Sequence, residues 1–484
     1  MEEFRDLSPC GSISTNDIIN LLRISVQQQY NAKERCEMNI TVEQNARTLF
    51  EQDYRCEIIL NTNGELSLSY PHNISVPVVD KWSKVQTSKI QSSVNIRDLF
   101  VRSRIARCRS RFVAPVIFVD GKYICRSSTL SSWAEIYSRS SMDRFIGTRN
   151  QSVVNPSTVD RTLTIDNDDT FNNVEQPEQR TIYDELRGAD IDLLKIYDVG
   201  SIVNLMVQKK YTLFGMKLTG SEKFDKYNRY GSFEMILLPY PGCEHFRELV
   251  TVKYNAELMF YKWSLPKNDA ILEIPIHLSS CLYTDWSFWR TWNSVELTKN
   301  YLQIILYQLE TNKCGILIHC LSGWDRTPLF ISLLRLSLWA DGCIHQSLTV
   351  EEILYLTLAY DWYLFGHNLS ERLKFDEEIL YFTFIMLPHL VENEFVFQPS
   401  NITNRQSILV ATEPNSHCSS GYHCVYPDIG KDSTKKTIRK EKLLAVSNLF
   451  HVCYLTVVPN DSNKLDPQRL GLHVARSIKN FFIR

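Results

Sequence analysis

The stretch Gly315-Ile-Leu-Ile-His-Cys320-Leu-Ser-Gly-Trp-Asp-Arg326-Thr-Pro328 decides the fold that this sequence predicts. Residues 315–319 are mostly apolar and typical of a buried strand, and the apolar run after Pro328 is typical of a buried helix. Thr327 is a candidate cap for that helix, because threonine is favoured at caps and proline in the first turn. A strand, a short loop and a helix N-terminus in this order predict a cradle for an anion.

Five residues separate Cys320 from Arg326, and this interval lets the loop curl so that its backbone N–H groups point at three phosphoryl oxygens. The amides and the helix dipole favour a thiolate at Cys320, which makes it a candidate nucleophile for attack on phosphorus. Arg326 is expected to bind two phosphate oxygens and to stabilise the transition state. The residues expected to line the substrate are Leu321, Ser322, Gly323, Trp324 and Thr327. The alternative is a buried structural cysteine beside a helix cap.

The chain around this loop alternates between strand patterns and helix patterns. Strands are predicted at residues 202–206, 233–238, 270–276 and 315–319, and a helix at residues 292–309 leads into the last of them. Another helix is predicted after Thr349, where Glu352 completes a capping box. This alternation predicts a mostly parallel sheet flanked by helices, in one α/β domain over residues 181–395.

Three further regions are predicted outside this domain. Residues 1–150 combine a helical start with short strand patterns, including a hairpin around Asp120-Gly121, and are expected to form an α+β region with membrane targeting as a candidate role. Residues 151–180 are acidic and lack apolar periodicity, which indicates a linker or a flexible insertion. Residues 396–484 form a polar tail, and its pattern leaves open whether it folds onto the domain.

Composition and charge exclude several classes of protein. The chain has 484 residues and a net charge of −2, so no global positive field favours nucleic acid. Its N-terminus lacks the pattern of a signal peptide, and no stretch is apolar for the length that a membrane span requires. We therefore expect a cytoplasmic protein whose thirteen cysteines are reduced. His417-Cys418 and His423-Cys424 have no second pair at a usual spacing, so no metal site is predicted.

Two basic clusters are candidate membrane contacts. One comprises Arg102, Arg104, Arg107, Arg109 and Arg111, and the other lies at residues 431–442. A solvated face is the simplest interpretation of the arginine cluster; contact with anionic lipid and a nuclear-import signal are the alternatives.

The motif His-Cys-x-x-Gly-Trp-Asp-Arg-Thr at residues 319–327 resembles the active-site loop of the myotubularin phosphoinositide 3-phosphatases. Further segments resemble the divergent branch of that family that includes the fly egg-derived tyrosine phosphatase, and they lie at residues 198–203, 238–244, 324–342 and 359–367. Together the resemblance covers roughly residues 181–395. This sequence departs from the family pattern at Leu321 and Ser322, where most active members carry serine and then aspartate.

This resemblance implies a fold like that of the cysteine-dependent protein tyrosine phosphatases and an activity on lipids. The implied reaction removes the 3-phosphate from phosphatidylinositol 3-phosphate and phosphatidylinositol 3,5-bisphosphate through a phosphocysteine intermediate, without metal or other cofactor. Cys320 carries over as the nucleophile, Arg326 as the phosphate ligand and Asp325 as the general acid. The implied partners are phosphoinositides at membrane surfaces, where the protein is expected to associate transiently.

Three alternatives remain open from the residues. Asp285 precedes Cys320 by about the interval at which tyrosine and dual-specificity phosphatases carry a mobile acid, so it competes with Asp325 for the acid role. A protein tyrosine or dual-specificity phosphatase would use the same cradle. A catalytically inactive lipid-binding scaffold would share the fold without the chemistry.

Overall fold

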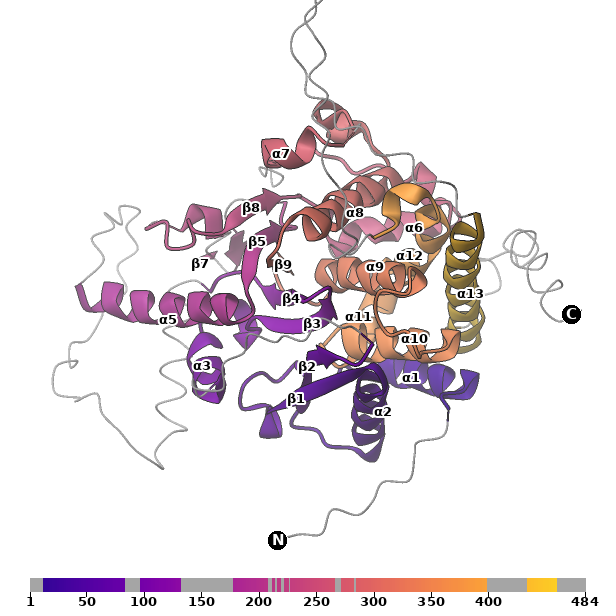
Figure 1. Ribbon diagram of the computed structural model, residues 1–484, viewed down its shortest axis with the longest axis horizontal. Coiled ribbons are helices and arrows are strands. Elements are labelled where there is room, and N and C mark those ends of the chain that lie inside the picture. The colour runs from indigo at the N-terminus through magenta and orange to yellow at the C-terminus, as the bar shows by residue number, and fades with distance from the viewer. Residues whose placement is uncertain are drawn as a thin grey trace, which may run out of the picture.

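The computed structural model describes residues 12–82, 96–131, 177–207, 211–213, 216–218, 222–225, 227–265, 271–282, 284–397 and 433–458. Around a central sheet, helices pack on both sides (Figure 1). Within these ranges, no helix is long and apolar enough to cross a membrane. The predicted linker at residues 151–180 falls almost wholly outside the described residues, apart from the start of α5 (Pro177–Ile196).

The central sheet has five strands in the order β3-β4-β9-β5-β8. Their bounds are β3 Ala114–Val119, β4 Lys122–Ser128, β5 Val199–Asn204, β8 Glu234–Leu237 and β9 Gly315–Cys320. Strands β4, β9, β5 and β8 pair in parallel, and β3 pairs antiparallel with β4. The predicted mostly parallel sheet and the hairpin are confirmed. The strand predicted at residues 270–276 is wrong, because that segment contributes one bridge, between Glu273 and Leu237, before helix α7 begins.

The predicted separation of residues 1–150 from the phosphatase domain requires correction. The hairpin of β3 and β4 lies in the same sheet as the loop-bearing strand, since β4 pairs with β9 from Ile124–Ile316 to Ser128–Cys320. A hairpin leaves a local sequence signal, whereas a parallel partner almost two hundred residues away leaves none. The boundary at residue 150 therefore divides one sheet. The smaller sheet of β1 (Tyr54–Leu60) and β2 (Asn73–Asp80) lies beside it.

The remaining elements surround these sheets. Their bounds in the N-terminal half are α1 Thr15–Gln27, α2 Glu37–Asp53, α3 Ile96–Ser103, β6 Tyr211–Leu213 and β7 Met216–Leu218. In the C-terminal half they are α6 Glu248–Thr251, α7 Ile276–Ser279, α8 Ser294–Thr311, α9 Arg326–Ala340, α10 Val350–Leu356, α11 Leu369–Lys374, α12 Ile379–Ile385 and α13 Ser433–Val457. The predicted helix before β9 is α8, and the predicted capping box of Thr349 and Glu352 opens α10. A π-helical turn, Thr357–Tyr363, extends α10.

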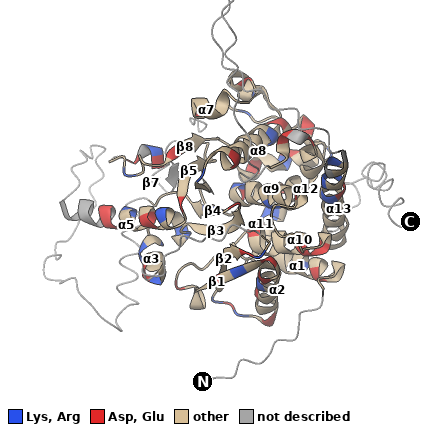
Figure 2. Cartoon of the chain, in the orientation of Figure 1, with Lys and Arg blue, Asp and Glu red and all other residues tan. Residues whose placement is uncertain are grey.

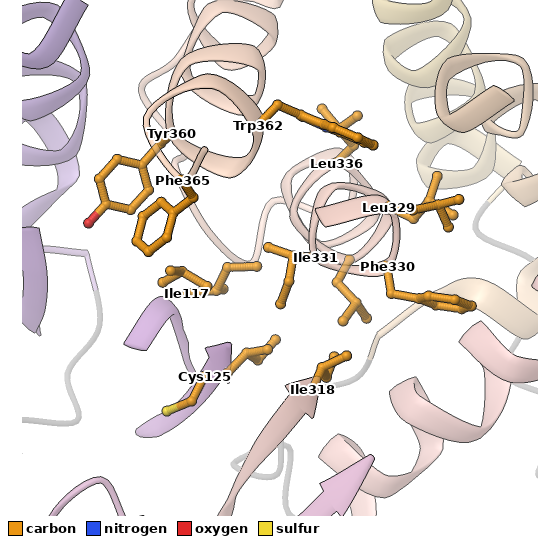
Figure 3. Close-up of a cluster of buried hydrophobic side chains, with 14 of the residues drawn as sticks. Ile117, Cys125, Ile318, Leu329, Phe330, Ile331, Leu336, Tyr360, Trp362 and Phe365 are labelled. Carbon is orange, nitrogen blue, oxygen red and sulfur yellow. The ribbon is translucent and has the colours of Figure 1, made fainter. Parts of the chain in front are cut away.

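Helix α9 is the centre of the core. Every residue from Thr327 to Ala340 is buried, as expected for a helix that is apolar on all sides. Figure 3 shows side chains of α9, such as Ile331 and Leu336, between the sheet and the segment that carries Trp362 and Phe365. Because packing holds this helix on all sides, the backbone of its first residue, Arg326, is held in a fixed position.

Helix α13 shows that part of the predicted tail belongs to the fold. It packs against α1, α9, α10 and α12, and Phe450 stacks on Phe384 with ring centroids 3.8 Å apart. Arg439, from the basic run at residues 431–442, is buried and donates to the Leu390 carbonyl and to Asp341. This run is therefore in part a structural contact. Figure 2 shows that the basic residues of α13 lie far from α3, the helix that carries Arg102 of the arginine cluster.

Candidate active site

The loop between β9 and α9 has the predicted architecture. Strand β9 ends at Cys320 and α9 begins at Arg326. Gly323 adopts φ +73°, and a Cβ there would lie 2.5 Å from the Ser127 carbonyl oxygen, so the tight loop requires glycine. The cap prediction is wrong in detail: Asp325 occupies the cap position, and Thr327 lies inside the first turn of α9.

The thiol of Cys320 is buried at the centre of this loop. Its side chain is 2% exposed, and the backbone N–H of Gly323 donates to its sulfur at 3.2 Å. Burial alone raises the pKa of the thiol, but the charge of Arg326, the hydroxyl and N–H of Thr327 and the N–H of Gly323 outweigh it. The pKa of Cys320 therefore lies below its ordinary value, which favours the nucleophilic thiolate.

Arg326 is held by the ends of two neighbouring strands. Its Nη1 donates to the carbonyls of Leu205, just after β5, and Tyr240, just after β8, both at 3.0 Å. Carboxyl ends of parallel strands meet at one edge of a sheet, which explains why residues so distant in the chain converge here. No described residue accepts a hydrogen bond from Nε or Nη2, so this half of the guanidinium fork suits a phosphate.

Asp325 lies beside His367 and Arg372. His367 Nδ1 is 3.0 Å from its Oδ1, and Arg372 Nε is 3.5 Å from the same oxygen. Burial raises the pKa of the carboxyl, but the hydrogen bond and charge of His367 and the charges of Arg372 and Arg326 lower it below the ordinary value. At neutral pH Asp325 is therefore a carboxylate. His367 follows the π-helical turn Thr357–Tyr363, so the segment after α10 reaches the loop.

Groups outside the loop bind its carbonyls. Thr129 N–H donates to the Leu321 carbonyl at 3.2 Å, and His367 Nδ1 lies 3.0 Å from the Trp324 carbonyl. Two buried arginines donate to the Gly323 carbonyl: Arg111 at 3.0 Å and Arg126 at 2.9 Å. The loop is thus supported by the N-terminal hairpin region and by the segment after α10.

The rim of the loop carries a third arginine. Arg109 donates to the Ser322 hydroxyl, and its Cζ lies 4.6 Å from the centroid of the Trp324 ring. Of the residues predicted to line the substrate, Leu321, Ser322 and Trp324 are partly exposed, whereas Gly323 and Thr327 are buried. Their contact with substrate stays a prediction. The interpretation of the arginine cluster as solvated or lipid-facing is wrong for Arg107 and Arg111, because both side chains are fully buried.

A buried network of charges lies behind the nucleophile. His319 Nε2 is 2.9 Å from Glu222 Oε2, Glu222 also pairs with Arg107, and Arg107 pairs with Asp190 at 2.7 Å. Burial opposes ionisation of Glu222, but His319 and Arg107 outweigh it and hold its pKa well below the usual range. The network connects His319 in β9 through Glu222 and Arg107 to Asp190 in α5. It therefore holds the end of β9 in place, where the loop begins.

Asp285, the competing acid, is exposed and engaged in its own turn. Its side chain caps the 3-10 helix Trp286–Thr291 and accepts a hydrogen bond from the N–H of Ser287 at 3.0 Å. The hydroxyl and the N–H of Ser287 both donate to Asp285, and these two bonds lower the pKa of its carboxyl. No described contact joins Asp285 to the loop. This geometry favours Asp325 over Asp285.

Several residues of the site were missed from the sequence. They are Arg109, Arg111, Arg126, Thr129 and Arg372. The arginines at 109 and 111 were visible only as a charge cluster, and no local pattern marks Arg126 or Thr129. In the described ranges, no group of three or more His, Cys, Asp or Glu side chains could hold a metal. His417-Cys418 and His423-Cys424 lie outside those ranges.

Comparison with known proteins finds curated relatives that are named as phosphatases. No protein-family model matches the chain. Two curated proteins named phosphatidylinositol-3,5-bisphosphate 3-phosphatase MTMR14, from Mus musculus and Homo sapiens, are each 44% identical to it over 360 residues. These matches cover 73% of this chain and 54% of either relative, so the chain spans about half the length of the curated relatives it matches. A phosphoinositide 3-phosphatase from Saccharomyces cerevisiae is 28% identical over 101 residues, 21% of this chain and 14% of that protein.

Proposed function

This chain is related to the myotubularin-related phosphoinositide 3-phosphatases, and from that relationship we propose that it is itself a cysteine-dependent phosphoinositide 3-phosphatase. The proposed substrates are phosphatidylinositol 3-phosphate and phosphatidylinositol 3,5-bisphosphate. One observation carries the proposal: the buried Cys320 thiol, with its lowered pKa, lies in a loop whose amides and fixed Arg326 suit a phosphate.

In the first proposed step, the Cys320 thiolate attacks phosphorus. The S–P bond forms while the bond from phosphorus to the inositol oxygen breaks, and the leaving alkoxide takes a proton from Asp325. Arg326 binds two of the phosphoryl oxygens and stabilises the charge that develops on them. In the second step, water attacks phosphorus and gives a proton to Asp325, while the S–P bond breaks and the thiolate returns.

The charge state of Asp325 fits the second step directly. Its lowered pKa makes it a carboxylate that can accept the proton from water. For the first step it must first gain a proton, and a bound phosphate dianion promotes this because a neighbouring negative charge raises the pKa of a carboxyl. Asp325 then alternates between acid and base.

The experiment that tests the function is a phosphate-release panel over all phosphoinositide isomers and a phosphotyrosine peptide. We expect release from the two 3-phosphorylated lipids, with little from the isomers that lack a 3-phosphate. Preference for the peptide by orders of magnitude would instead identify a protein tyrosine phosphatase. No release from any substrate would identify an inactive scaffold.

Asp325→Asn is expected to slow hydrolysis of the lipid by about 10² to 10⁴. An aryl phosphate has a leaving group that needs no proton, so formation of the phosphocysteine from it should be nearly unaffected. The measurement is rapid-quench kinetics on both substrates. Asp285→Asn is the matched control, and a lipid-specific loss in that variant alone would transfer the acid role to Asp285.

Arg109→Gln is expected to lower kcat/KM for phosphatidylinositol 3,5-bisphosphate by about tenfold to a hundredfold, a loss typical of one charge-assisted contact. The reason is that Arg109 brings a cation to the loop rim against Ser322 and Trp324, where a second anionic group of the substrate would lie. Steady-state kinetics on this lipid and on an aryl phosphate, which lacks a second anion, make the comparison. An equal loss on both substrates would assign Arg109 to loop support instead.

We further propose that the protein works in the cytoplasm and contacts membranes transiently, since its proposed substrates lie in a bilayer. Of the arginine cluster, Arg102 is exposed and Arg104 bonds to the Glu65 carbonyl, so few of its charges are available to a lipid surface. Sedimentation with liposomes that contain phosphatidylinositol 3-phosphate tests this contact. Absence of binding at low salt would contradict it.

A further inference from the structure

Two buried arginines converge on one carbonyl of the phosphate loop. Arg111 lies just before β3 and Arg126 lies in β4, and both are 0% exposed. Each donates through Nη2 to the Gly323 carbonyl oxygen, at 3.0 Å and 2.9 Å. The same two guanidinium groups also hold the segment after α10. Arg111 donates through the same Nη2 to the Phe365 carbonyl, and Arg126 donates through Nη1 to the Asp361 carbonyl.

This contact has a geometric consequence for the next amide. The peptide bond between Gly323 and Trp324 is trans, so its carbonyl and its N–H point in opposite directions. Because the carbonyl is turned toward the two arginines, the N–H of Trp324 is turned away from them. The N–H of Gly323 already donates to the Cys320 sulfur, so two successive amides of the loop are fixed in place.

The two arginines also bring positive charge into the protein interior. In the described part of the chain, Arg111 donates to carbonyls and to the Ser69 hydroxyl and forms no ion pair. Arg126 has Asp361 nearby, but Arg335 binds both oxygens of that carboxylate. Burial lowers the pKa of Arg111 to about 10, and the negative charge of Cys320 opposes that shift at both arginines. By reciprocity, both arginines favour the Cys320 thiolate.

We propose that Arg111 and Arg126 are positioning residues of the phosphate loop, which orient the Trp324 amide toward the phosphate and stabilise the Cys320 thiolate by their charge. The proposal rests on the proposed phosphatase function. It assigns to the N-terminal hairpin, and to the residues just before it, a positioning role for a loop almost two hundred residues later. The two contributions are separable, because the hydrogen-bonding fork and the charge can be removed one at a time.

The test uses four variants of the full chain and two measurements. Methionine at either position removes the charge, and lysine keeps the charge but loses the planar fork. The first measurement is the pH dependence of Cys320 alkylation by iodoacetamide, followed by mass spectrometry. The second is the dissociation constant of orthovanadate, an oxyanion that probes the cradle without turnover. Neither measurement requires phosphatase activity. A wild-type protein that released no phosphate would therefore overturn the proposed function, while the positioning role would still be decided by alkylation and vanadate binding.

For Arg111→Met and Arg126→Met, we expect the alkylation midpoint to move to higher pH by about one unit, which is a tenfold smaller thiolate fraction below both midpoints. For Arg111→Lys and Arg126→Lys, we expect a nearly unchanged midpoint and about tenfold weaker vanadate binding. A wild-type midpoint in folded methionine variants would overturn the electrostatic role. If those variants do not fold, the lysine variants decide, and wild-type vanadate affinity in both would overturn the orienting role.

Arg439 supplies a matched control. It is also buried and donates to carbonyls, those of Leu390 and Ser337, and it pairs with Asp341. It contacts α9 and the chain near α12 without touching the loop. Arg439→Met and Arg439→Lys should lower thermal stability yet leave the alkylation midpoint and the vanadate affinity at wild-type values. Shifts of equal size in the Arg439 variants would show that any buried arginine produces them, and would overturn the proposal.

Discussion

Replacing Cys320 with serine is expected to lower kcat on phosphatidylinositol 3-phosphate by about 10⁵ to 10⁶, the loss typical of removing a catalytic nucleophile. The loop amides and Arg326 stabilise a thiolate, but a serine hydroxyl has a far higher intrinsic pKa and remains protonated in the same surroundings. The substitution changes one atom in a buried position, so the fold and the cradle should persist. Cys320→Ser should therefore still bind orthovanadate or the substrate.

The measurement combines phosphate release with rapid-quench mass spectrometry. Wild-type protein quenched during turnover should carry one phosphoryl group on the peptide that contains Cys320, and the serine variant should carry none. Cys314→Ser, one residue before β9, is the control and should keep wild-type activity. Activity that survives in Cys320→Ser, or a phosphoryl group on another residue, would contradict the assigned nucleophile.

Replacing Arg326 with methionine is expected to lower kcat/KM by about 10³ to 10⁵, as for other arginines that stabilise a transferring phosphoryl group. The effect has two sources, because methionine removes the fork that binds phosphate and also a charge that lowers the pKa of Cys320. Alkylation of Cys320 in this variant should consequently require a higher pH than in the wild type.

Arg326→Lys separates these two sources. It keeps a positive charge near the thiol but cannot donate to the Leu205 and Tyr240 carbonyls and to phosphate in the same planar geometry. We expect an alkylation midpoint close to wild type, together with a loss of kcat/KM that is most of the loss in Arg326→Met. Near-wild-type turnover in the lysine variant would show that charge alone suffices, contrary to the bidentate role.

The sequence predicted the parts of the site that are contiguous in the chain. The strand, loop and helix around Cys320 and Arg326 were predicted from three local signals within fourteen residues. These are the apolar pattern, Gly323 and the five-residue interval between the cysteine and the arginine. The parallel sheet was also predictable, because strands and helices alternate along the chain. These signals are local, and local signals survive in a single sequence.

The parts that were missed depend on contacts between distant segments. Arg111 and Arg126 meet the Gly323 carbonyl only because β4 pairs with β9, and parallel pairing leaves no mark in either strand. A cluster of arginines is most often solvated, so Arg107 and Arg111 were interpreted as surface charge although both are buried. Their partners, Glu222 and the Gly323 and Phe365 carbonyls, are not adjacent in sequence.

The position of β9 between β4 and β5 has a consequence for shortened forms of this chain. A fragment that starts at residue 181 would contain the whole loop motif, yet β9 would become an edge strand with a row of unpaired backbone groups. Such an edge recruits strands from other molecules, so the fragment should aggregate rather than behave as a minimal phosphatase. Any truncation, splice form or expression boundary that removes the first hairpin thus creates a solubility problem at the catalytic strand itself.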